Sequence, residues 1–333
     1  MDKQIVFTSK NNAEFLPDEV KKPAPYEIRV KTAFSTISNG TEKANITGCV
    51  SAGDDVNVPQ YPKILGYSTS GVVEELGDEV SQFSVGDRVA MYWSTHRNYN
   101  VINEKNAVKV PDNVSLREAA LAHIATFPLA AIRKTRLEIG ETVMVMGLGT
   151  LGLIAVNLAS VAGAGCVIAV DPVENRRNKA LEFGADYAFN PFEEDFATKI
   201  KEITNGGVNV AIEVTGQGAG LDETLDCMAK FGRIALLGCT RNSDFSIDYY
   251  KKIHFPGITL VGAHTLARPE LESHQGWYTV SDDMKTILNL CSKKRLNLEN
   301  MIEETHSPCE CKKVYDRLVN DKNFPTVVQF KWD

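Results

Sequence analysis

The run Val143-Met-Val-Met-Gly-Leu-Gly-Thr-Leu-Gly152 joins an apolar segment to a turn rich in glycine. Gly147, Gly149 and Gly152 follow what looks like a buried strand, and an apolar helical segment, residues 151–161, opens directly from them. Glycines in that context allow a tight turn and let backbone N–H groups approach a pyrophosphate, which the helix N-terminus also attracts. The run therefore predicts a dinucleotide-binding loop. Glycines that only pack a helix on a strand are the alternative.

Outward from this run, apolar segments alternate with helical ones between residues 141 and 264. The expected strands are residues 143–146, 167–170, 210–214, 234–237 and 259–261. The expected helices are residues 151–161, 174–183, 196–204 and 221–230. Because the strands are apolar on both faces and a helix follows each one, the pattern predicts a parallel sheet in a doubly wound α/β domain.

Asp171 ends the second of these apolar segments, 24 residues after Gly147. A carboxylate there can accept hydrogen bonds from both hydroxyls of an adenosine ribose and repels a 2'-phosphate, so it favours NAD over NADP. Arg176 and Arg177 follow closely and weaken that preference, because a guanidinium accommodates a 2'-phosphate. The alternative role of Asp171 is to cap the helix that follows it.

The first 115 or so residues show a different pattern, with short β-like segments between turn residues. These segments are residues 27–32, 70–75, 88–92 and 107–110. Gly-Asp pairs at residues 77–78 and 86–87 supply the turn chemistry, so an all-β, barrel-like first domain is expected. After about residue 265 the pattern is irregular, with helices expected near residues 282–292 and 311–319 and a strand at 326–330.

Length and composition narrow the class of protein. With 333 residues the chain exceeds the size at which one core usually stops growing, so two domains are expected. A formal net charge of -7 disfavours a nucleic-acid partner, which requires clustered Lys and Arg. The N-terminus lacks the apolar core of a secretory signal, and no apolar stretch reaches the roughly 18 residues that cross a bilayer. A cytoplasmic protein with no membrane partner is therefore expected, and its seven scattered cysteines suit reduced thiols.

Five motifs occur in order along the chain: Ile64-Leu-Gly-Tyr-Ser-Thr-Ser-Gly-Val-Val-Glu74, Val85-Gly-Asp-Arg-Val89, Glu118-Ala-Ala120, the loop at residues 147–152 and Glu182-Phe-Gly-Ala-Asp186. With these motifs the chain resembles the medium-chain dehydrogenase/reductase superfamily, in its zinc-type alcohol dehydrogenase-like branch. The resemblance implies a GroES-like β-barrel domain, residues 1–124 with 265–333, and a Rossmann dinucleotide-binding domain, residues 125–264. It also implies an active site in the cleft between the two domains.

The resemblance extends to the residues that would contact the dinucleotide. It puts Val214-Thr-Gly216 near the adenosine ribose and Leu237-Gly-Cys-Thr240 near the nicotinamide carboxamide. His264, Thr265 and Arg268 are expected at the mouth of the cleft. The full expected set is Gly147, Gly149, Thr150, Leu151, Gly152, Asp171, Arg176, Val214, Thr215, Gly238, Cys239, Ala263 and His264. Downstream, His274 and Trp277 lie in a polar loop that would suit a sugar-like or anionic substrate, or else forms a plain surface turn.

The chain departs from the zinc-dependent members of that family. Asn39 stands at the position of a cysteine ligand, and Gly66-Tyr67-Ser68 replaces a Gly-His-Glu element, which removes an imidazole and its acidic neighbour. His123 falls near the last ligand position, and Glu42 could offer a carboxylate. Catalytic zinc normally needs three protein ligands, so no zinc is expected. The structural-zinc lobe is missing as well, since no cysteine lies between residues 49 and 166.

Without a metal, carbonyl reduction needs a proton donor for the developing alkoxide. The candidates are Tyr67, at a former ligand position, Thr41, which matches the family's proton-relay hydroxyl, and His123. Three alternatives stay open: Tyr67 fills the space of the metal, Thr41 only binds the backbone, and His123 is a core histidine. Lys63 and His96 are weaker candidates, and His96 is as readily a solvated loop histidine.

Three functions follow from these observations. The leading one is an NAD(H)-dependent oxidoreductase that acts on an alcohol or carbonyl group of a small molecule, a polyol or sugar derivative, without zinc. The alternatives are an enone or quinone reductase, which usually prefers NADPH and which Asp171 disfavours, and a non-catalytic dinucleotide-binding protein. Members of the superfamily pair through an edge strand, here residues 257–262, so a homodimer is expected.

Overall fold

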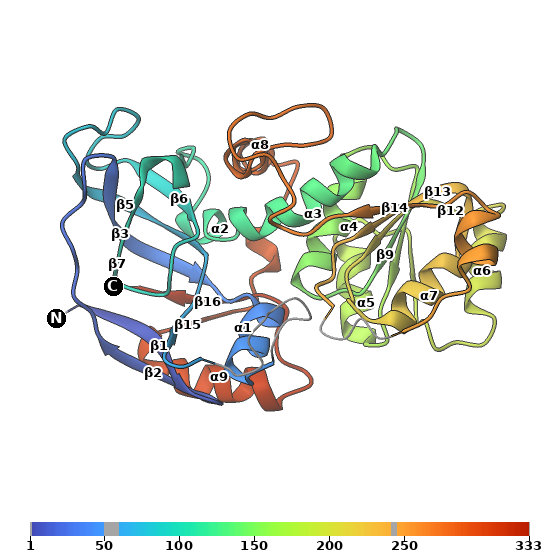
Figure 1. Cartoon of the computed structure of the whole chain (residues 1–333), viewed down its shortest axis with the longest axis horizontal. Coiled ribbons are helices and arrows are strands. Elements are labelled where there is room, and N and C mark those ends of the chain that lie inside the picture. The colour runs from blue at the N-terminus through green and yellow to red at the C-terminus, as the bar shows by residue number, and fades with distance from the viewer. Residues whose placement is uncertain (1, 50–59, 241–244, 333) are drawn as a thin grey trace. The chain divides into compact units, whose positions relative to one another are not determined.

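The computed structural model describes residues 2–49, 60–240 and 245–332, and Figure 1 shows their helices and strands. The chain forms two compact units, the first from Met1–Ile124 with Val280–Asp333 and the second from Ala125–Thr279. Among the described residues, the first unit contains two sheets and the second contains one.

Residues 265–279, which the sequence assigns to the first domain, belong to the second unit. Side chains of helix α3 (Ala122–Thr135) contact this segment. Lys134 donates a hydrogen bond to the Ala267 carbonyl at 2.5 Å, and the Arg133 guanidinium lies 3.7 Å from the centre of the Tyr278 ring. These side-chain contacts carry no periodic signal, so the sequence pattern misses them.

The second unit is built on a six-stranded sheet whose neighbouring strands all run parallel. In spatial order the strands are β11 (Tyr187–Phe189), β10 (Cys166–Val170), β9 (Thr142–Met146), β12 (Val208–Glu213), β13 (Met228–Leu236) and β14 (Thr259–Gly262). The connecting helices are α4 (Thr150–Val161), α5 (Glu174–Glu182), α6 (Phe196–Ile203) and α7 (Gly218–Asp226). The order reverses between β9 and β12, which confirms the doubly wound α/β architecture and marks its ligand-binding switch point.

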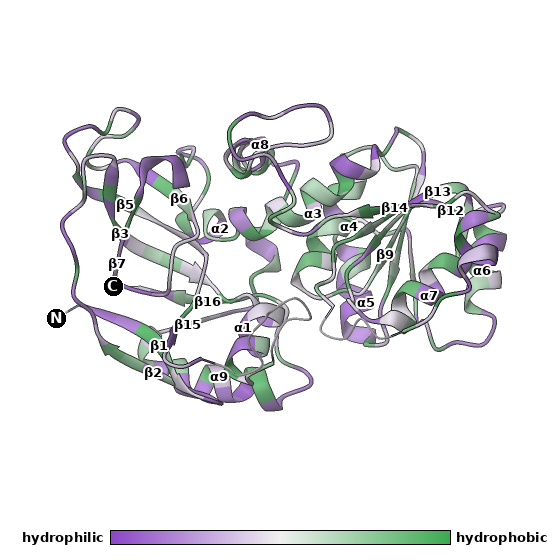
Figure 2. Ribbon diagram, viewed as in Figure 1, coloured by the Kyte–Doolittle hydropathy of each residue, from purple (hydrophilic) through white to green (hydrophobic). Residues whose placement is uncertain are grey.

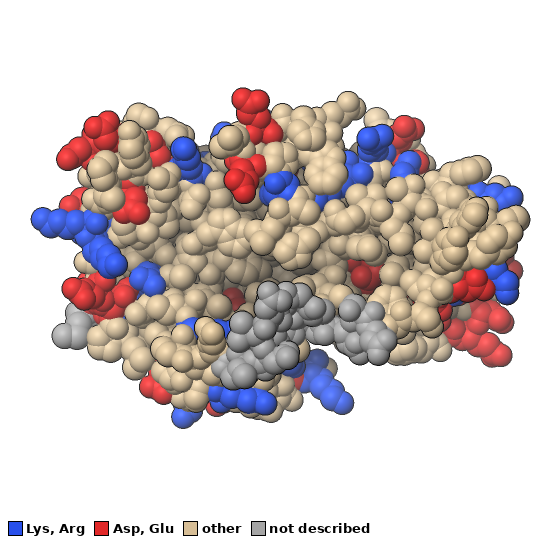
Figure 3. Space-filling view, viewed as in Figure 1, with Lys and Arg blue, Asp and Glu red and all other residues tan. Residues whose placement is uncertain are grey.

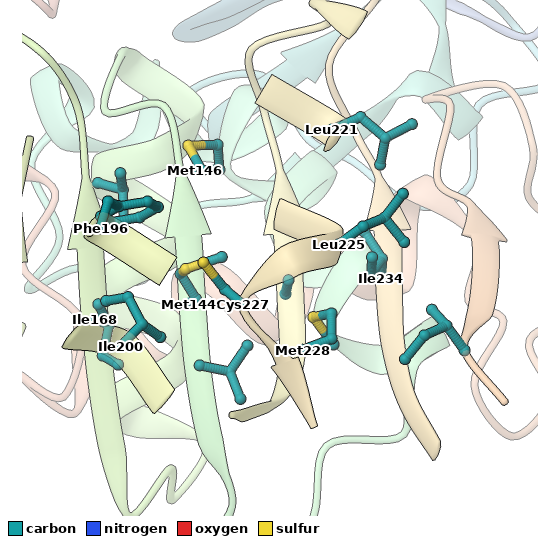
Figure 4. Packing of buried hydrophobic residues seen from close by; sticks show 14 residues of the cluster. Met144, Met146, Ile168, Phe196, Ile200, Leu221, Leu225, Cys227, Met228 and Ile234 are labelled. Atoms are coloured by element: carbon teal, nitrogen blue, oxygen red, sulfur yellow. The ribbon is translucent and has the colours of Figure 1, made fainter. Parts of the chain in front are cut away.

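Helices α6 and α7 cover one face of this sheet. Phe196 and Ile200 of α6 and Leu221 and Leu225 of α7 join Met144 of β9 in one buried cluster (Figure 4). Right-handed crossovers put α4 and α5 on the opposite face. The strands are therefore apolar on both sides, as the green arrows of this unit show in Figure 2. Each fully buried Leu, Ile or Phe side chain contributes roughly 1.5–3 kcal/mol.

One helix of this unit is shorter than the sequence predicts. A helix is expected over residues 221–230, but α7 ends at Asp226 and β13 already begins at Met228. Met228 is paired with Val208 of β12, whose N–H donates to the Cys227 carbonyl at 3.0 Å. The backbone hydrogen bonds that this segment forms with β12 therefore outweigh its helical propensity.

The first unit combines a seven-stranded and a three-stranded sheet. The larger sheet contains β3 (Glu27–Thr36), β5 (Ser68–Leu76), β6 (Arg88–Tyr92), β7 (Tyr99–Asn103), β8 (Ala107–Lys109), β15 (Glu304–His306) and β16 (Val328–Lys331). The smaller one contains β1 (Lys3–Ser9), β2 (Asn12–Pro17) and β4 (Lys63–Ile64). Because β16 pairs with β3, the C-terminal strand completes the sheet that the N-terminal segment begins.

Helices also occur in the first unit, so the expected all-β domain is only part of the structure. They include α1 (Asn39–Ile46), α2 (Leu116–Ala119), α8 (Val280–Ser292) and α9 (Cys311–Asn320). Helix α1 starts shortly after β3 and turns Glu42, Ala44 and Ile46 inward. Because Glu42 lies on the buried face of this short helix, the helical spacing of apolar residues is interrupted, and the sequence does not predict α1.

Within the described residues, no helix is long and apolar enough to cross a membrane. On the face in Figure 3, Lys and Arg side chains are interspersed with Asp and Glu side chains and form no continuous basic surface. A phosphate backbone would find no extended cationic stripe on that face.

Candidate active site

The glycine turn between β9 and α4 has the backbone geometry of an anion-binding loop. Gly147 has a φ of 96°, which favours glycine, and a Cβ there would lie 3.0 Å from Thr215 Cγ2. A Cβ on Gly152 would overlap the Gly147 carbonyl oxygen. At Gly149, the N-cap of α4, no atom lies within 4 Å of the corresponding position. A phosphate group could therefore approach the N-terminus of α4 at Gly149, and helix N-termini attract anions.

Asp171 follows β10 and ties it to the glycine turn. It is buried, and its two carboxylate oxygens accept hydrogen bonds from the N–H groups of Leu148 and Val173, each at 2.8 Å. Arg176 lies 3.6 Å from one carboxylate oxygen, whereas Arg177 donates to the Asp171 carbonyl at 2.8 Å. Because Val173 is the N-cap residue of α5, Asp171 does help to organise that helix. A carboxylate offers about four acceptor positions, so two remain for ribose hydroxyls.

Glu213, the last residue of β12, shapes the turn beside Gly147. The buried carboxylate accepts hydrogen bonds from the N–H groups of Thr215 at 2.8 Å and Gly216 at 3.2 Å, and from the Thr215 hydroxyl. Burial raises the pKa of Glu213, and these hydrogen bonds oppose the shift. Val214 and Thr215 are thereby held next to the glycine turn. Glu213 is missing from the sequence-based set, although an acidic residue at the end of an apolar strand could have signalled it.

The remaining expected cofactor residues follow β13 and β14. Gly238 and Cys239 pack against Gly216, where a Cβ would lie 2.8 Å from the Cys239 carbonyl oxygen. Ala263 is buried directly after β14, and His264 beside it is exposed. Since the carboxyl ends of parallel strands lie at one edge of the sheet, these residues share that edge with the glycine turn.

In the first unit, Tyr67 and Thr41 belong to one cluster of hydroxyl groups. The Tyr67 phenol donates to the Ser38 hydroxyl and is also hydrogen-bonded to Thr41. The residue as a whole is half-buried, yet burial of the phenol raises the pKa of Tyr67 to about 12. The two hydroxyls oppose this pKa shift and the Glu42 carboxylate adds to it. The phenol therefore keeps its proton at neutral pH. The sequence does not single out Ser38, because only the fold of α1 turns it toward Tyr67.

His123 is buried against the backbone of Tyr67. Its Nδ1 lies 2.6 Å from the Tyr67 carbonyl oxygen, and because a carbonyl only accepts, Nδ1 carries the proton. The imidazole packs edge-on against Tyr67 at 5.4 Å and Trp93 at 4.9 Å between ring centres. The structure thus brings Tyr67, Thr41 and His123 together in the first unit. His123 contacts the ring and the carbonyl oxygen of Tyr67, and Thr41 is hydrogen-bonded to the Tyr67 hydroxyl.

A second buried pair, Glu42 and His96, lies behind this cluster. Their side chains are both 1% exposed, and His96 Nε2 lies 3.2 Å from a Glu42 carboxylate oxygen. That oxygen also accepts the Tyr315 hydroxyl at 2.5 Å, and the other accepts the Ser38 N–H at 2.8 Å. His96 is therefore a core residue, and the alternative of a solvated loop histidine is wrong. Lys63, the other weaker candidate, donates to the Asn45 side chain at 3.0 Å.

The other ring nitrogen of His96 has a partner as well. Its Nδ1 lies 2.7 Å from the Ser35 hydroxyl, which itself accepts the Trp332 indole N–H at 2.8 Å. Both ring nitrogens of His96 are therefore engaged in the interior, and the Glu42 carboxylate contacts His96, Ser38 and Tyr315 there.

The side chains that the resemblance places at zinc-ligand positions have other partners in this structure. Asn39 uses its amide nitrogen to bind the carbonyls of Pro325 at 2.9 Å and Thr326 at 3.0 Å. The Glu42 carboxylate contacts His96 and accepts hydrogen bonds from Ser38 and Tyr315. The Tyr67 phenol stays protonated at neutral pH because its pKa is raised to about 12. Among the described residues there is no group of three or more His, Cys, Asp and Glu side chains that could hold a metal ion.

Two family models match the chain. One, for the alcohol dehydrogenase GroES-like domain, covers residues 24–128, and the other, for zinc-binding dehydrogenase, covers residues 150–282. L-threonine 3-dehydrogenase of Pyrococcus furiosus is 31% identical over 335 aligned residues, which cover 87% of each chain. D-guloside 3-dehydrogenase of Escherichia coli K12 is 26% identical over 90% of this chain and 91% of its own.

Solved structures share the fold over nearly the whole chain. A dehydrogenase from Sinorhizobium meliloti 1021 bound to NADP has a TM-score of 0.83 at 19% identity, with 99% of both chains covered. An alcohol dehydrogenase from Escherichia coli CFT073 complexed with NADH has a TM-score of 0.84 at 20% identity, again with 99% of both chains covered. At these identities the likeness shows the fold alone.

Proposed function

The chain belongs to the medium-chain dehydrogenase/reductase superfamily as an alcohol dehydrogenase-like oxidoreductase, and from that premise we propose that it transfers a hydride between NAD(H) and a polyol or sugar derivative. The observation that carries the proposal is the Tyr67 phenol, which is hydrogen-bonded to the hydroxyls of Ser38 and Thr41. The resemblance to zinc-type relatives implies a ligand at this position. Both sequence relatives are named for dehydrogenation at carbon 3 of a hydroxyl compound, which supports a secondary alcohol as the reacting group.

Bound NADH would supply the hydride to the carbonyl carbon. Tyr67 donates its proton to the developing alkoxide, which is far more basic than a phenolate, and the hydroxyls of Ser38 and Thr41 relay a replacement proton. His123 orients Tyr67 through the 2.6 Å contact with its carbonyl oxygen. In alcohol oxidation the same groups act in reverse. The proposed steps themselves require no zinc.

A cofactor and substrate screen tests this proposal. The protein is incubated with NAD⁺ or NADP⁺ and with polyols, cyclic sugars or secondary alcohols, and with NADH or NADPH and aldehydes, ketones or enones, while absorbance of the reduced nicotinamide is followed. We expect turnover of alcohols and their carbonyl products with NAD(H). Turnover of enones alone would show an enone reductase instead, and the hydride acceptor proposed here would be wrong.

NADH is expected to bind more tightly than NADPH by roughly tenfold or more, since about 1.4 kcal/mol of repulsion between Asp171 and a 2'-phosphate gives that ratio. Calorimetric titration of both cofactors measures it. Asp171→Ser should narrow the ratio, whereas Arg176→Ala, which removes the guanidinium 3.6 Å from Asp171, should widen it. Tighter binding of NADPH to the unaltered protein would refute the role given to Asp171.

We also propose that the protein is a homodimer paired through β14. This strand is one of the two edge strands of the six-stranded sheet, and Leu260 on it is 38% exposed. Phe231 and Phe255, on the segments leading into this edge, are largely exposed as well, and the Phe231 N–H donates to Pro256 at 2.8 Å. An open edge with apolar neighbours favours continuation of the sheet into a second subunit.

Light scattering at micromolar concentration is expected to give the mass of a dimer for the unaltered protein and of a monomer for Leu260→Lys. The introduced ammonium would have to be buried in the paired edge, which costs more than such an interface can offset. Leu271→Lys is the matched control, because Leu271 is an exposed leucine of the same unit outside this edge. A monomeric unaltered protein, or a dimeric Leu260→Lys, would contradict pairing through β14.

A further inference from the structure

A tight turn at residues 274–277 presents two aromatic rings on the second unit. His274 and Trp277 exchange backbone hydrogen bonds, N–H to carbonyl in both directions, each at 2.8 Å. Gly276 between them has a φ of 81°, which a tight turn of this kind requires. The two rings lie 6.5 Å apart between centres, with only 32° between their planes. The closed turn thus holds the two rings side by side, tilted relative to each other.

Lys134 supports the Trp277 ring from one side. Its ammonium lies 4.6 Å from the centre of the indole and donates to the carbonyls of Ala267 at 2.5 Å and Gly262 at 3.3 Å. Lys134 itself is buried, whereas Trp277 remains 36% exposed. Since the ammonium covers one face of the indole, the exposed surface belongs to the rest of the ring. The contact with Lys134 therefore orients the indole and leaves the rest of its surface exposed.

The same lysine places the turn at the edge of the sheet where ligands bind. Gly262 is the last residue of β14, so Lys134 ties Trp277 to the carboxyl end of that strand. The glycine turn after β9 and the exposed His264 lie at this edge too. Ligands of doubly wound sheets bind outside the carboxyl ends of the strands. An exposed aromatic surface at this place is therefore positioned for a ligand.

The chemistry of the surface selects among the ligands that the sequence left open. An anionic substrate is disfavoured, because the buried ammonium of Lys134 is directed at two carbonyl groups and at the indole. A flat aromatic face flanked by an imidazole and an indole N–H instead matches a molecule with a C–H face and a rim of hydroxyls. A pyranose ring has both, whereas an extended polyol has no comparable flat face.

We propose that Trp277 and His274 form a stacking subsite for the pyranose ring of a neutral cyclic sugar substrate. The inference rests on the proposed dehydrogenase function and narrows its substrate class from polyols and sugars to ring-form sugars. Trp277 supplies the apolar platform, and His274, which is exposed, supplies a hydrogen-bonding group for a ring hydroxyl.

Saturation-transfer NMR with methyl β-D-glucopyranoside tests the subsite without requiring turnover. We expect saturation of the sugar C–H protons by the unaltered protein and its loss in Trp277→Ala, while Trp277→Phe retains part of it. Tyr250→Ala, which removes another exposed aromatic ring of the same unit, is the control and should behave as the unaltered protein. No saturation by the unaltered protein, or equal saturation in Trp277→Ala, overturns the proposal.

Kinetics separate a failure of this subsite from a failure of the proposed function. With NAD⁺, Trp277→Ala should raise KM for oxidisable methyl glycopyranosides by roughly tenfold, the factor that about 1.4 kcal/mol of lost stacking gives. KM for sorbitol and the Kd for NADH should stay within about twofold of the unaltered protein. Oxidation of sorbitol but of no glycopyranoside refutes the subsite alone, whereas no turnover of any alcohol or carbonyl compound refutes the dehydrogenase function.

Discussion

Tyr67→Phe is expected to lower kcat/KM for carbonyl reduction by roughly 10²–10⁴-fold, the usual range for a positioned proton donor. The substitution removes only the hydroxyl that is hydrogen-bonded to Ser38 and Thr41, and the ring keeps its contact with His123. The Kd for NADH, measured by calorimetry, should be nearly unchanged, because the expected cofactor residues belong to the second unit. A loss in kcat/KM without a change in cofactor affinity identifies a group that acts in the transition state.

Metal analysis completes this experiment. After exhaustive chelation and dialysis, the unaltered protein is expected to retain its activity and to contain less than stoichiometric zinc, because Asn39 and Tyr67 are poor ligands. Tyr92→Phe is a matched control, since its hydroxyl binds the carbonyl of Lys105 and lies outside the Ser38 cluster. Zinc that tracks with activity, or full turnover by Tyr67→Phe, would end the acid–base role of this phenol.

The pH dependence of the two reaction directions follows from the raised pKa of Tyr67. At a pKa of about 12 the phenol is protonated throughout the accessible range, so its contribution to carbonyl reduction should not change between pH 6 and pH 10, roughly. Alcohol oxidation needs the phenolate, whose fraction rises about tenfold per pH unit below the pKa. Oxidation should therefore accelerate steadily with pH, and Tyr67→Phe should abolish that slope.

The parts of the fold that the sequence predicts are those with a local, repeating signal. The apolar strands of the second unit and the glycine turn depend on neighbouring residues, so their pattern survives without knowledge of the packing. Some of the elements that it misses are short or carry polar residues on their buried face. Strand β4 has two residues, β11 has three, and α1 buries Glu42. Their conformation depends on partners far away in the chain.

The same distinction applies to the candidate site. Asp171 and Gly147 stand out by their spacing, whereas Tyr67 and Thr41 stand out only by resemblance to a family. The sequence does not reveal that Glu42 binds His96, 54 residues away, and Tyr315, 273 residues away. A buried acid and a buried imidazole in separate segments look like surface residues until the fold brings them together.

Glu42→Ala is expected to lower the free energy of unfolding of the first unit by roughly 3–5 kcal/mol, the range for removing one member of a buried charged network. The Ser38 N–H, the Tyr315 hydroxyl and the imidazole of His96 would all lose their acceptor in the interior. Glu42→Gln keeps the shape but turns an amide toward one of these donors, so about 1–3 kcal/mol should be lost.

Urea unfolding followed by tryptophan fluorescence measures this loss. Trp93 and Trp332 lie in the first unit and Trp277 is the third tryptophan of the chain, so a Trp277→Phe background restricts the signal to that unit. Lys285→Ala is the control in the same unit, because Lys285 forms an exposed ion pair with Asp282 at 3.3 Å, and such pairs contribute at most about 1 kcal/mol. The network links stability to function, since the Glu42 carboxylate holds the Ser38 N–H and Ser38 accepts the phenol of Tyr67. Glu42→Gln should therefore also lower kcat for carbonyl reduction. A Glu42→Ala variant no less stable than Lys285→Ala would show that the carboxylate does not stabilise this unit.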